Sequence, residues 1–465
     1  MSKSGKILFY GALGVLLAIL VVLLAWTFSK KPDLKEENAP PAEKPDSFSL
    51  ELLSIEQFGS EEDDSAQGFA LDETGIYIAG ETEGDLYGEN AAGENSESTP
   101  GAAYTRNDGV SNLDAPEDAF VAKYSLDGKS LLWSEQFGTS SYDSARGIAV
   151  NRTGVYVGGT TEGSLEDDLI GLSDLFLRKY SHEGELLWAK QWGTTKMDEG
   201  LWVSSEEDRV CIGGGTLGQL GPEPKNGDED VFATCFDNNG EELWTLQFGS
   251  EKFEEALGGT MENGALYLVG ATSGALEENT KPKREDVFVA KINAEGSLEF
   301  IKQFGSGLTD FGHDVAVQGQ SIYIAARTEG PFGKDEALGL SDALVVALST
   351  NGSEFLWSDQ YGTPDGDTAR AITADKNGVF VTGVINGKLE KHGPETNLED
   401  IFIRHYSPEG KLLSETFLDS GAYDDPRELI LQNNILYVVG QTGGELGDEN
   451  YGAWDIFLAR YNLNN

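Results

Sequence analysis

A pattern of about 56 residues recurs seven times along this chain, and this repetition constrains the fold more than any other feature. Each copy contains a Gln-Phe-Gly tripeptide or a close variant of it. The glycine of the tripeptide lies at Gly59, Gly138, Gly193, Gly249, Gly305 and Gly362, and Leu418 takes its slot in the last copy. Only the first interval is clearly longer. Such a period indicates repeated supersecondary units that stack on one another.

Each copy resolves into four short apolar runs. In the second copy these runs cover residues 147–150, 155–159, 175–180 and 186–191. They are rich in β-branched and aromatic residues, which is typical of strands, and turns that contain Gly154 and Gly184 can close two hairpins. Four strands per copy without predicted helices indicate an all-β fold, a seven-bladed β-propeller of four-stranded antiparallel blades. A continuous solenoid is the alternative, although its usual repeats are shorter.

The two ends of the chain complement each other. The last copy supplies three strands, at 428–432, 435–441 and 455–461, and then stops. The missing fourth strand has its counterpart at the start of the chain, in residues 48–59. We expect this segment to complete the seventh blade as its outermost strand, a 3+1 latch that closes the ring and covers an exposed edge.

The units resemble the SBBP-type β-propeller repeat. The resemblance is carried best by Gln136–Thr139, Asp143–Ala145, Tyr156–Thr161 and Asp174–Tyr180, and it extends from residue 48 to residue 461. It implies a surface or secreted propeller and assigns no reaction.

The first 47 residues differ in character from the repeats. An apolar run from Ile7 to Phe28 has lysines on both sides and is long enough, at about 33 Å as a helix, to cross a bilayer. We predict an uncleaved single-pass anchor over 1–28, with a cleaved signal peptide and a secreted protein as the alternative. Residues 29–47 are rich in proline and charge and predict a disordered, extended linker. The propeller then occupies 48–465.

The charge balance limits the partners. The chain has 80 acidic and 33 basic residues, a formal net charge of −47, which argues against binding nucleic acid or an anionic membrane surface. We therefore expect a monomeric propeller outside the cytoplasm that contacts the membrane through its N-terminal helix alone. Its expected partner is a cell-surface protein or a glycan.

Acidic residues recur at two positions of the repeat. The first set precedes the innermost strand and comprises Asp64, Asp143, Asp198, Glu254, Asp310, Asp367 and, one residue late, Asp424. The second precedes the third strand and comprises Asp118, Asp174, Asp230, Asp286, Asp342, Asp400 and Asp455. Both sets should lie on one face. The first set could bind Ca²⁺ near the central channel, but a position used in every blade favours carboxylates that accept backbone N–H groups and lock a turn.

Other recurring residues are predicted to be structural. The glutamines of the tripeptide should bond backbone groups between blades, and the tryptophans of the fourth strands should fill the space between blades. Cys211 and Cys235 should face each other on adjacent strands, either bridged or, as the sequence slightly favours, as two buried thiols. The acidic segment from Glu81 to Asp118 is an enlarged loop that either carries function or is a tolerated insertion.

No catalytic motif is visible in the sequence. The four histidines occupy different slots of the repeat, and there is neither a nucleophile elbow nor a phosphate-binding loop. We therefore favour a non-catalytic binding, scaffold or adhesion module. The alternative is a cell-surface polysaccharide hydrolase or lyase that uses carboxylates on one propeller face. Two or three carboxylates gathered with an arginine or an aromatic residue would favour the enzyme.

Overall fold

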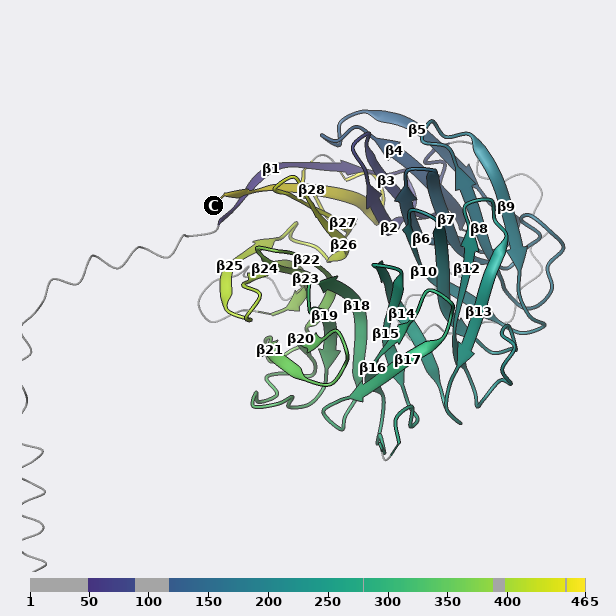
Figure 1. Ribbon diagram of the computed structural model, residues 1–465. Coiled ribbons are helices and arrows are strands. Elements are labelled where there is room, and N and C mark those ends of the chain that lie inside the picture. Colours follow the sequence, from purple (N-terminus) through teal and green to yellow (C-terminus); the bar gives the residue numbers. More distant parts are fainter. Residues whose placement is uncertain (1–48, 88–116, 279, 388–397, 448–449, 465) are drawn as a thin grey trace, which may run out of the picture. The chain divides into compact units, whose positions relative to one another are not determined.

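The computed structural model describes residues 49–87, 117–278, 280–387, 398–447 and 450–464. These residues form 28 β-strands in seven antiparallel sheets of four strands each, arranged around a common axis (Figure 1). The predicted all-β, seven-bladed propeller is confirmed.

Six blades use four strands that are consecutive in the chain. Blade 1 comprises β2 (Asp64–Leu71), β3 (Ile76–Thr82), β4 (Asp118–Tyr124) and β5 (Leu131–Phe137). Blade 2 comprises β6 (Asp143–Asn151), β7 (Gly154–Thr161), β8 (Asp174–Tyr180) and β9 (Leu186–Trp192). Blade 3 comprises β10 (Asp198–Glu206), β11 (Arg209–Thr216), β12 (Asp230–Asp237) and β13 (Glu242–Phe248). Blade 4 comprises β14 (Glu254–Glu262), β15 (Ala265–Thr272), β16 (Asp286–Ile292) and β17 (Leu298–Phe304). Blade 5 comprises β18 (Asp310–Gln318), β19 (Ser321–Thr328), β20 (Asp342–Ser349) and β21 (Phe355–Tyr361). Blade 6 comprises β22 (Thr368–Asp375), β23 (Gly378–Asn386), β24 (Glu399–Tyr406) and β25 (Leu412–Leu418).

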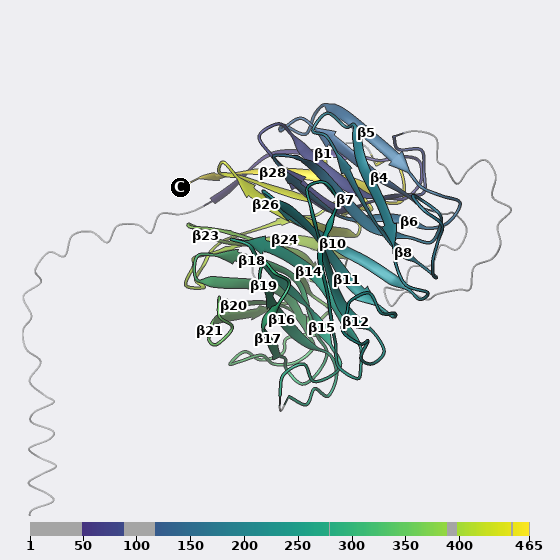
Figure 2. The ribbon, with the colours of Figure 1, turned by 45° about the vertical axis from the view of Figure 1, so that its right-hand side comes forward.

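The seventh blade joins the two ends of the chain. Its strands lie in the order β1 (Ser49–Phe58), β28 (Asp455–Asn464), β27 (Ile435–Thr442), β26 (Asp424–Gln432). The pairing of β1 with β28 runs from Ser49 opposite Asn464 to Phe58 opposite Ile456, and Figure 2 shows these two strands side by side. One strand from the start of the described chain therefore shares a sheet with three from its end.

The middle strands of each blade are buried on both faces. Every residue of β7 and β8 is buried, whereas the outermost strand β9 begins with exposed residues. Because neighbouring blades cover both faces, these strands appear in the sequence as continuous apolar runs rather than as alternating patterns. The cores lie between blades: Phe137 of blade 1 meets Phe176 of blade 2 edge to face, with ring centroids 5.8 Å apart.

The innermost strands surround the axis, and each contacts the innermost strand of the next blade. The ring is closed, since β2 of blade 1 contacts β26 and β27 of blade 7. At this boundary Asp64 N donates a hydrogen bond of 3.0 Å to Trp454 O, and Asp143 N donates to Glu117 O at 2.9 Å in the same way between blades 1 and 2.

Each innermost strand contains a β-bulge near its start. In β6 the register against β7 shifts between Ala145 and Gly147, so that Arg146 is the extra residue. The same shift occurs in β2, β10, β14, β18, β22 and β26. A bulge turns the side chain of its extra residue out of the regular pleat.

The register of the last β24–β25 pair corrects one assignment from the sequence. Leu418 lies opposite Ile401, which corresponds to Phe248 opposite Val231 in blade 3. Leu418 therefore takes the place of the phenylalanine in the tripeptide, and Asp419 takes the place of the glycine. The assignment was wrong because connections differ in length by one residue, which a fixed period does not show. With this register Asp424 is no longer one residue late.

Several sequence predictions concern residues that the structure does not describe. The anchor at 1–28, the linker at 29–47 and most of the loop between Glu81 and Asp118 lie outside the described residues. Within the described ranges, no helix has the length and apolar character needed to span a membrane.

Candidate ligand site at the ring axis

Both sets of recurring acids lie at the same end of their blades. Asp64 at the start of β2 is opposite Thr82, which is in turn opposite Asp118 at the start of β4. The structure therefore brings the two sets together on one face, as the sequence predicts.

The first set accepts hydrogen bonds that hold the turn before each innermost strand. Glu254 accepts from Ser250 N at 2.6 Å and from Thr272 Oγ1 at 2.7 Å, and the other members accept from an equivalent N–H four residues earlier. Burial raises the pKa of Asp143 to about 6, against the lowering effect of its hydrogen bonds. This geometry agrees with the turn-locking role, while Ca²⁺ binding by the set stays a prediction.

The second set anchors the glutamine of the tripeptide. Gln191 Nε2 donates to Asp174 Oδ2 at 2.9 Å and to Gly163 O at 3.0 Å, while its Oε1 accepts from Leu165 N at 2.9 Å. All these partners belong to blade 2. The prediction that the glutamines bond groups between blades is therefore wrong, because the connection between the second and third strands folds back over its own blade.

The glycine of the tripeptide is required by the proximity of the two acids. A Cβ on Gly193 would lie 2.7 Å from Asp174 Oδ1 and 2.9 Å from Asp198 Oδ2, closer than real side chains approach. Blade 6 departs from this rule, because Asp419 stands in the glycine slot.

This departure gathers three carboxylates. One oxygen each of Asp400, Asp419 and Asp424 lie within 4.8 Å of one another, an arrangement that could hold a metal ion. Asp424 belongs to the predicted Ca²⁺ set, whereas Asp400 and Asp419 do not. Sequence reasoning missed Asp419 because Leu418 had been placed in its slot.

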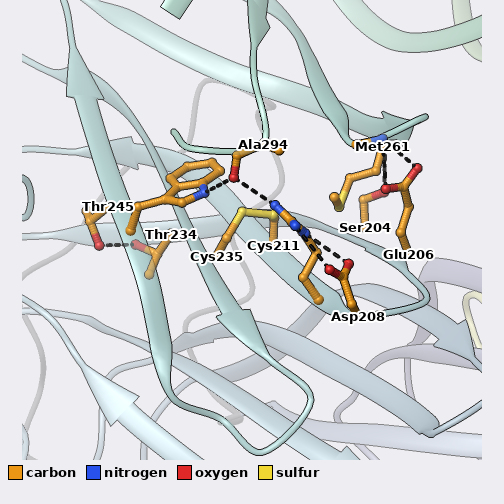
Figure 3. The surroundings of a disulfide bond; sticks show 12 residues. Ser204, Glu206, Asp208, Cys211, Thr234, Cys235, Thr245, Met261 and Ala294 are labelled. Carbon is orange, nitrogen blue, oxygen red and sulfur yellow. Dashed lines mark hydrogen bonds and ion pairs between the residues drawn. A yellow bond between two sulfur atoms is a disulfide. The ribbon is translucent and has the colours of Figure 1, made fainter. Parts of the chain in front are cut away.

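The two cysteines are bonded to each other. Cys211 and Cys235 lie directly opposite on β11 and β12, and the structure joins them in a disulfide (Figure 3). The two free thiols that the sequence slightly favoured are therefore not what the structure holds. Arg209 and Trp244 close over the bridge by donating to Ala294 O at 2.7 and 3.1 Å.

The fourth-strand tryptophans join neighbouring blades. Trp133 Nε1 donates to His182 O of the next blade at 3.0 Å, and the ring covers Gly184, whose φ of 89° excludes most side chains. Trp188 and Trp244 repeat the contact. This arrangement agrees with the predicted space-filling role.

A charged cluster surrounds the axis at the same end of the ring, and we call it the axial cluster. Its members come from the starts of the innermost strands and from adjoining strand ends: Glu81, Arg146, Glu199, Glu255, His313, Arg327, Arg370, Asp425 and Arg427. Most are half-buried, and Glu81 and Asp425 are buried. Three of the eleven arginines in the sequence occupy bulge positions here, namely Arg146, Arg370 and Arg427.

Sequence reasoning did not single out these arginines. A signal was present, since each follows a first-set acid by three residues, as in Asp143–Arg146 and Asp367–Arg370. The blades concerned are far apart in the sequence, and only the closed ring brings their bulges together.

Two arginines share one carboxylate. Arg370 Nε lies 3.2 Å from Asp425 Oδ1, and Arg427 Nη2 lies 3.3 Å from Asp425 Oδ2. Burial lowers the pKa of Arg427, and the nearby charges of Arg370 and Arg146 lower it further, against the effect of Asp425. Both arginine side chains keep about 30% of their surface exposed.

Arg146 is held on the other side of the axis. Its Nη2 donates to the Tyr142 hydroxyl at 3.1 Å, and that hydroxyl donates to Glu81 Oε2 at 2.9 Å. Gln67 Nε2 donates to Glu81 Oε1 at 2.9 Å. Burial alone would lower the pKa of Arg146, but Tyr142 and Glu81 raise it above its usual value.

Blades 3 and 4 contribute acids to the cluster. Burial, followed by the negative charge of Glu199, raises the pKa of Glu255 to about 7, although Arg146 opposes the shift. Burial and the charges of Glu255 and Glu199 raise the pKa of the neighbouring Glu229 to about 9. The cluster therefore has an arginine-rich side and a carboxyl-rich side.

Comparisons with known proteins leave the specific family open. No known family model matches the chain, so the resemblance to the SBBP-type repeat stays a prediction. The chain is 24% identical over 343 residues to the regulatory protein FlaEY of Caulobacter vibrioides, in a match covering 63% of this chain and 35% of that protein. The chain thus spans about a third of the length of this relative.

Solved structures with similar folds include the WD40 propeller domain of Doa1 and the endosialidase of phage phi92. The first has a TM-score of 0.47 at 9% identity and covers 89% of this chain and 96% of that chain. The second has a TM-score of 0.46 at 9% identity and covers 89% and 69%. At these values the likeness carries no argument about function, and the assignment as a seven-bladed propeller rests on the chain's own strand topology.

Proposed function

We propose that this chain is a membrane-tethered, extracytoplasmic propeller of the SBBP type that acts as a non-catalytic binding module through its axial cluster. The observation that carries the proposal is the pair Arg370 and Arg427, two partly exposed guanidinium groups that share the carboxylate of Asp425. Nothing in the blade itself needs arginine at these positions, since the other blades carry Gln67, Leu201 or other residues there.

The setting of the proposal has separate support. The apolar run from Ile7 to Phe28 supports an anchor. The disulfide between Cys211 and Cys235 supports an oxidising compartment, such as the cell surface. The name of the regulatory relative is consistent with a role that does not require catalysis.

We also propose that β1 acts as a latch that keeps the ring closed, as the pairing with β28 suggests. In this scheme the propeller works as a monomer, because the seventh blade is completed within the same chain.

The proposal is tested by screening the full-length chain against surface glycans and surface proteins, with and without calcium. We expect a ligand whose binding is lost when Arg370 and Arg427 are both changed to glutamine and kept when the exposed Arg152 is changed. A ligand that binds equally well to all three proteins would refute the assignment of the site.

The second candidate is the polysaccharide hydrolase or lyase. It is favoured by one observation, the proximity of Glu199, Glu255 and Arg146, because a carboxyl group with a pKa of about 7 is suited to general acid catalysis. New reducing ends or unsaturated ends released from acidic polysaccharides, and absent with Glu255→Gln, would establish it. Binding without turnover would leave the binding module as the function.

A further inference from the structure

The arginine-rich side of the axial cluster has more hydrogen-bond donors than acceptors. Each guanidinium carries five N–H donors, and the Asp425 carboxylate is the group that Arg370 and Arg427 share. The buried Nε of Arg427 has no hydrogen-bond partner among the described residues. A buried donor without a partner is costly, so the arrangement favours an additional acceptor at this point.

Positive charge also gathers on this side. Arg370 and Arg427 share the carboxylate of Asp425, and Arg327, whose partner is Glu329 at 3.2 Å, lies near them beside His313. Glu399 is the other carboxyl group near both guanidinium groups, and burial raises its pKa, which opposes its negative charge. Like charges held together in a partly buried place are stabilised by a counter-ion. The planar guanidinium fork matches the two oxygens of a carboxylate.

The opposite side limits the kind of anion. Glu199 and Glu255 repel a ligand that is negative along its whole length, and the net charge of −47 acts in the same direction. Carboxyl groups accept hydrogen bonds from hydroxyl and ammonium groups. A ligand with one anionic end and hydrogen-bond donors at the other end satisfies both sides.

We infer that the axial cluster binds a small monocarboxylate, with its carboxylate between Arg370 and Arg427 and hydroxyl or ammonium donors directed to Glu199 and Glu255. The inference rests on the proposed function, because it names the ligand class of the same site. The carboxylate could belong to an acidic sugar or to an amino acid, and the experiment separates these sources.

The test is calorimetric titration of the full-length chain with four probes. D-Glucuronate offers a carboxylate and hydroxyls, β-alanine a carboxylate and an ammonium group, acetate only a carboxylate, and D-glucose only hydroxyls. We expect saturable binding of glucuronate or β-alanine, whichever source is correct. Acetate and glucose should bind at least about tenfold more weakly, since each lacks the charged hydrogen bonds to one side of the cluster.

Variants connect the binding to the residues. Arg370→Gln and Arg427→Gln should each weaken binding of the positive probe about tenfold or more, and Arg370→Lys should restore it only in part, because lysine lacks the fork. Arg152→Gln is the matched control, since Arg152 forms an exposed ion pair with Glu207. The melting temperature of each variant shows whether it folds.

Two results would overturn the inference. One is the absence of saturable binding for both glucuronate and β-alanine at millimolar concentrations; the other is binding that neither arginine variant weakens. The inference can fail while the proposed function stands. A macromolecular ligand whose binding needs Arg370 and Arg427, in a protein that binds neither monocarboxylate, would refute the inference and leave the binding module in place.

Discussion

Replacing Gln57 by alanine tests whether β1 is an integral part of the seventh blade. Gln57 is 5% exposed, and its Nε2 donates to Gly444 O and to Asp455 Oδ2, both at 2.9 Å. Its Oε1 accepts from Leu446 N at 3.0 Å. These bonds connect the start of the propeller to strands near the end of the chain.

The chain provides a matched variant. Gln191 is 7% exposed and makes the equivalent bonds to Gly163, Asp174 and Leu165 at 3.0, 2.9 and 2.9 Å, but all within one continuous stretch of blade 2. Both glutamines make the same kinds of bonds, but Gln191 lies on a strand that directly follows its neighbour β8 in the chain, whereas Gln57 lies on a strand from the other end of the chain. Their comparison therefore isolates the contribution of the latch.

The magnitude follows from the groups left without partners. Gln57→Ala removes four side-chain hydrogen bonds, the longest of 3.5 Å, and Gln191→Ala removes five. Each variant leaves a buried carboxylate and a partly buried carbonyl with one donor fewer, which amounts to about 2–4 kcal/mol. At about 2.1 cal/mol/K per residue, the unfolding entropy of roughly 400 residues is about 0.9 kcal/mol/K, so a loss of about 3 kcal/mol lowers Tm by about 3–4 °C.

Differential scanning calorimetry of the full-length chain measures the effect. We expect Gln57→Ala and Gln191→Ala to lower Tm by the same amount to within about 1 °C, and Gln320→Ala, whose side chain is exposed, to leave Tm unchanged. A Gln57 variant as stable as the unmodified protein, beside a destabilised Gln191 variant, would show that β1 frays and does not latch the ring.

Three further predictions concern the disulfide, calcium and pH. Changing Cys211 and Cys235 to alanine should lower stability by about 3 kcal/mol for a loop of 24 residues, and alkylation without reductant followed by mass spectrometry should find no free thiol; a labelled thiol contradicts the bridge. Millimolar calcium should raise Tm, and Asp419→Gly, which restores the glycine of the repeat, should abolish the shift; an equal shift in both proteins places the ion elsewhere. The pKa values of Asp143 (about 6) and Glu255 (about 7) are raised above those of the unfolded chain, so the folded state binds more protons and Tm should fall as pH rises from about 4 to 7; Asp143→Asn should flatten the lower half of this slope, and a Tm that rises over this range contradicts it.

The architecture could be predicted from the sequence because each blade of a propeller corresponds to its own copy of the repeat. The period, the four strands and the tight turns are local features, and every blade repeats them. The placement of Leu418 was wrong because a connection in this copy differs in length by one residue. Counting residues along a fixed period cannot show whether the extra residue lies in a strand or in a loop. Strand pairing places Asp419 in the slot instead.

The site was harder to predict because it does not exist in any single blade. Arg146 belongs to blade 2, Arg370 to blade 6 and Arg427 to blade 7, and their proximity depends on the closure of the ring. Composition concealed them as well, since a chain with 80 acids and 33 bases directs attention to the acids. The recurring acids prove to be engaged in hydrogen bonds with their own blades or with the adjoining turns.

The repeat itself separates structural positions from functional ones. The first-set acid recurs in every blade, and the glutamine and the glycine recur in every blade but the sixth, because each completes a hydrogen-bonded turn or permits a close approach. The bulge position three residues after the acid has no such duty, and it holds Gln67, Arg146, Leu201, Leu257, His313, Arg370 and Arg427 in turn. Because the fold does not require a particular residue at this position, ligand binding can determine which residue is present. Three arginines there, in a chain so rich in acid, therefore point to an anion at the axis, whereas the conserved geometry of the acids points to the blade.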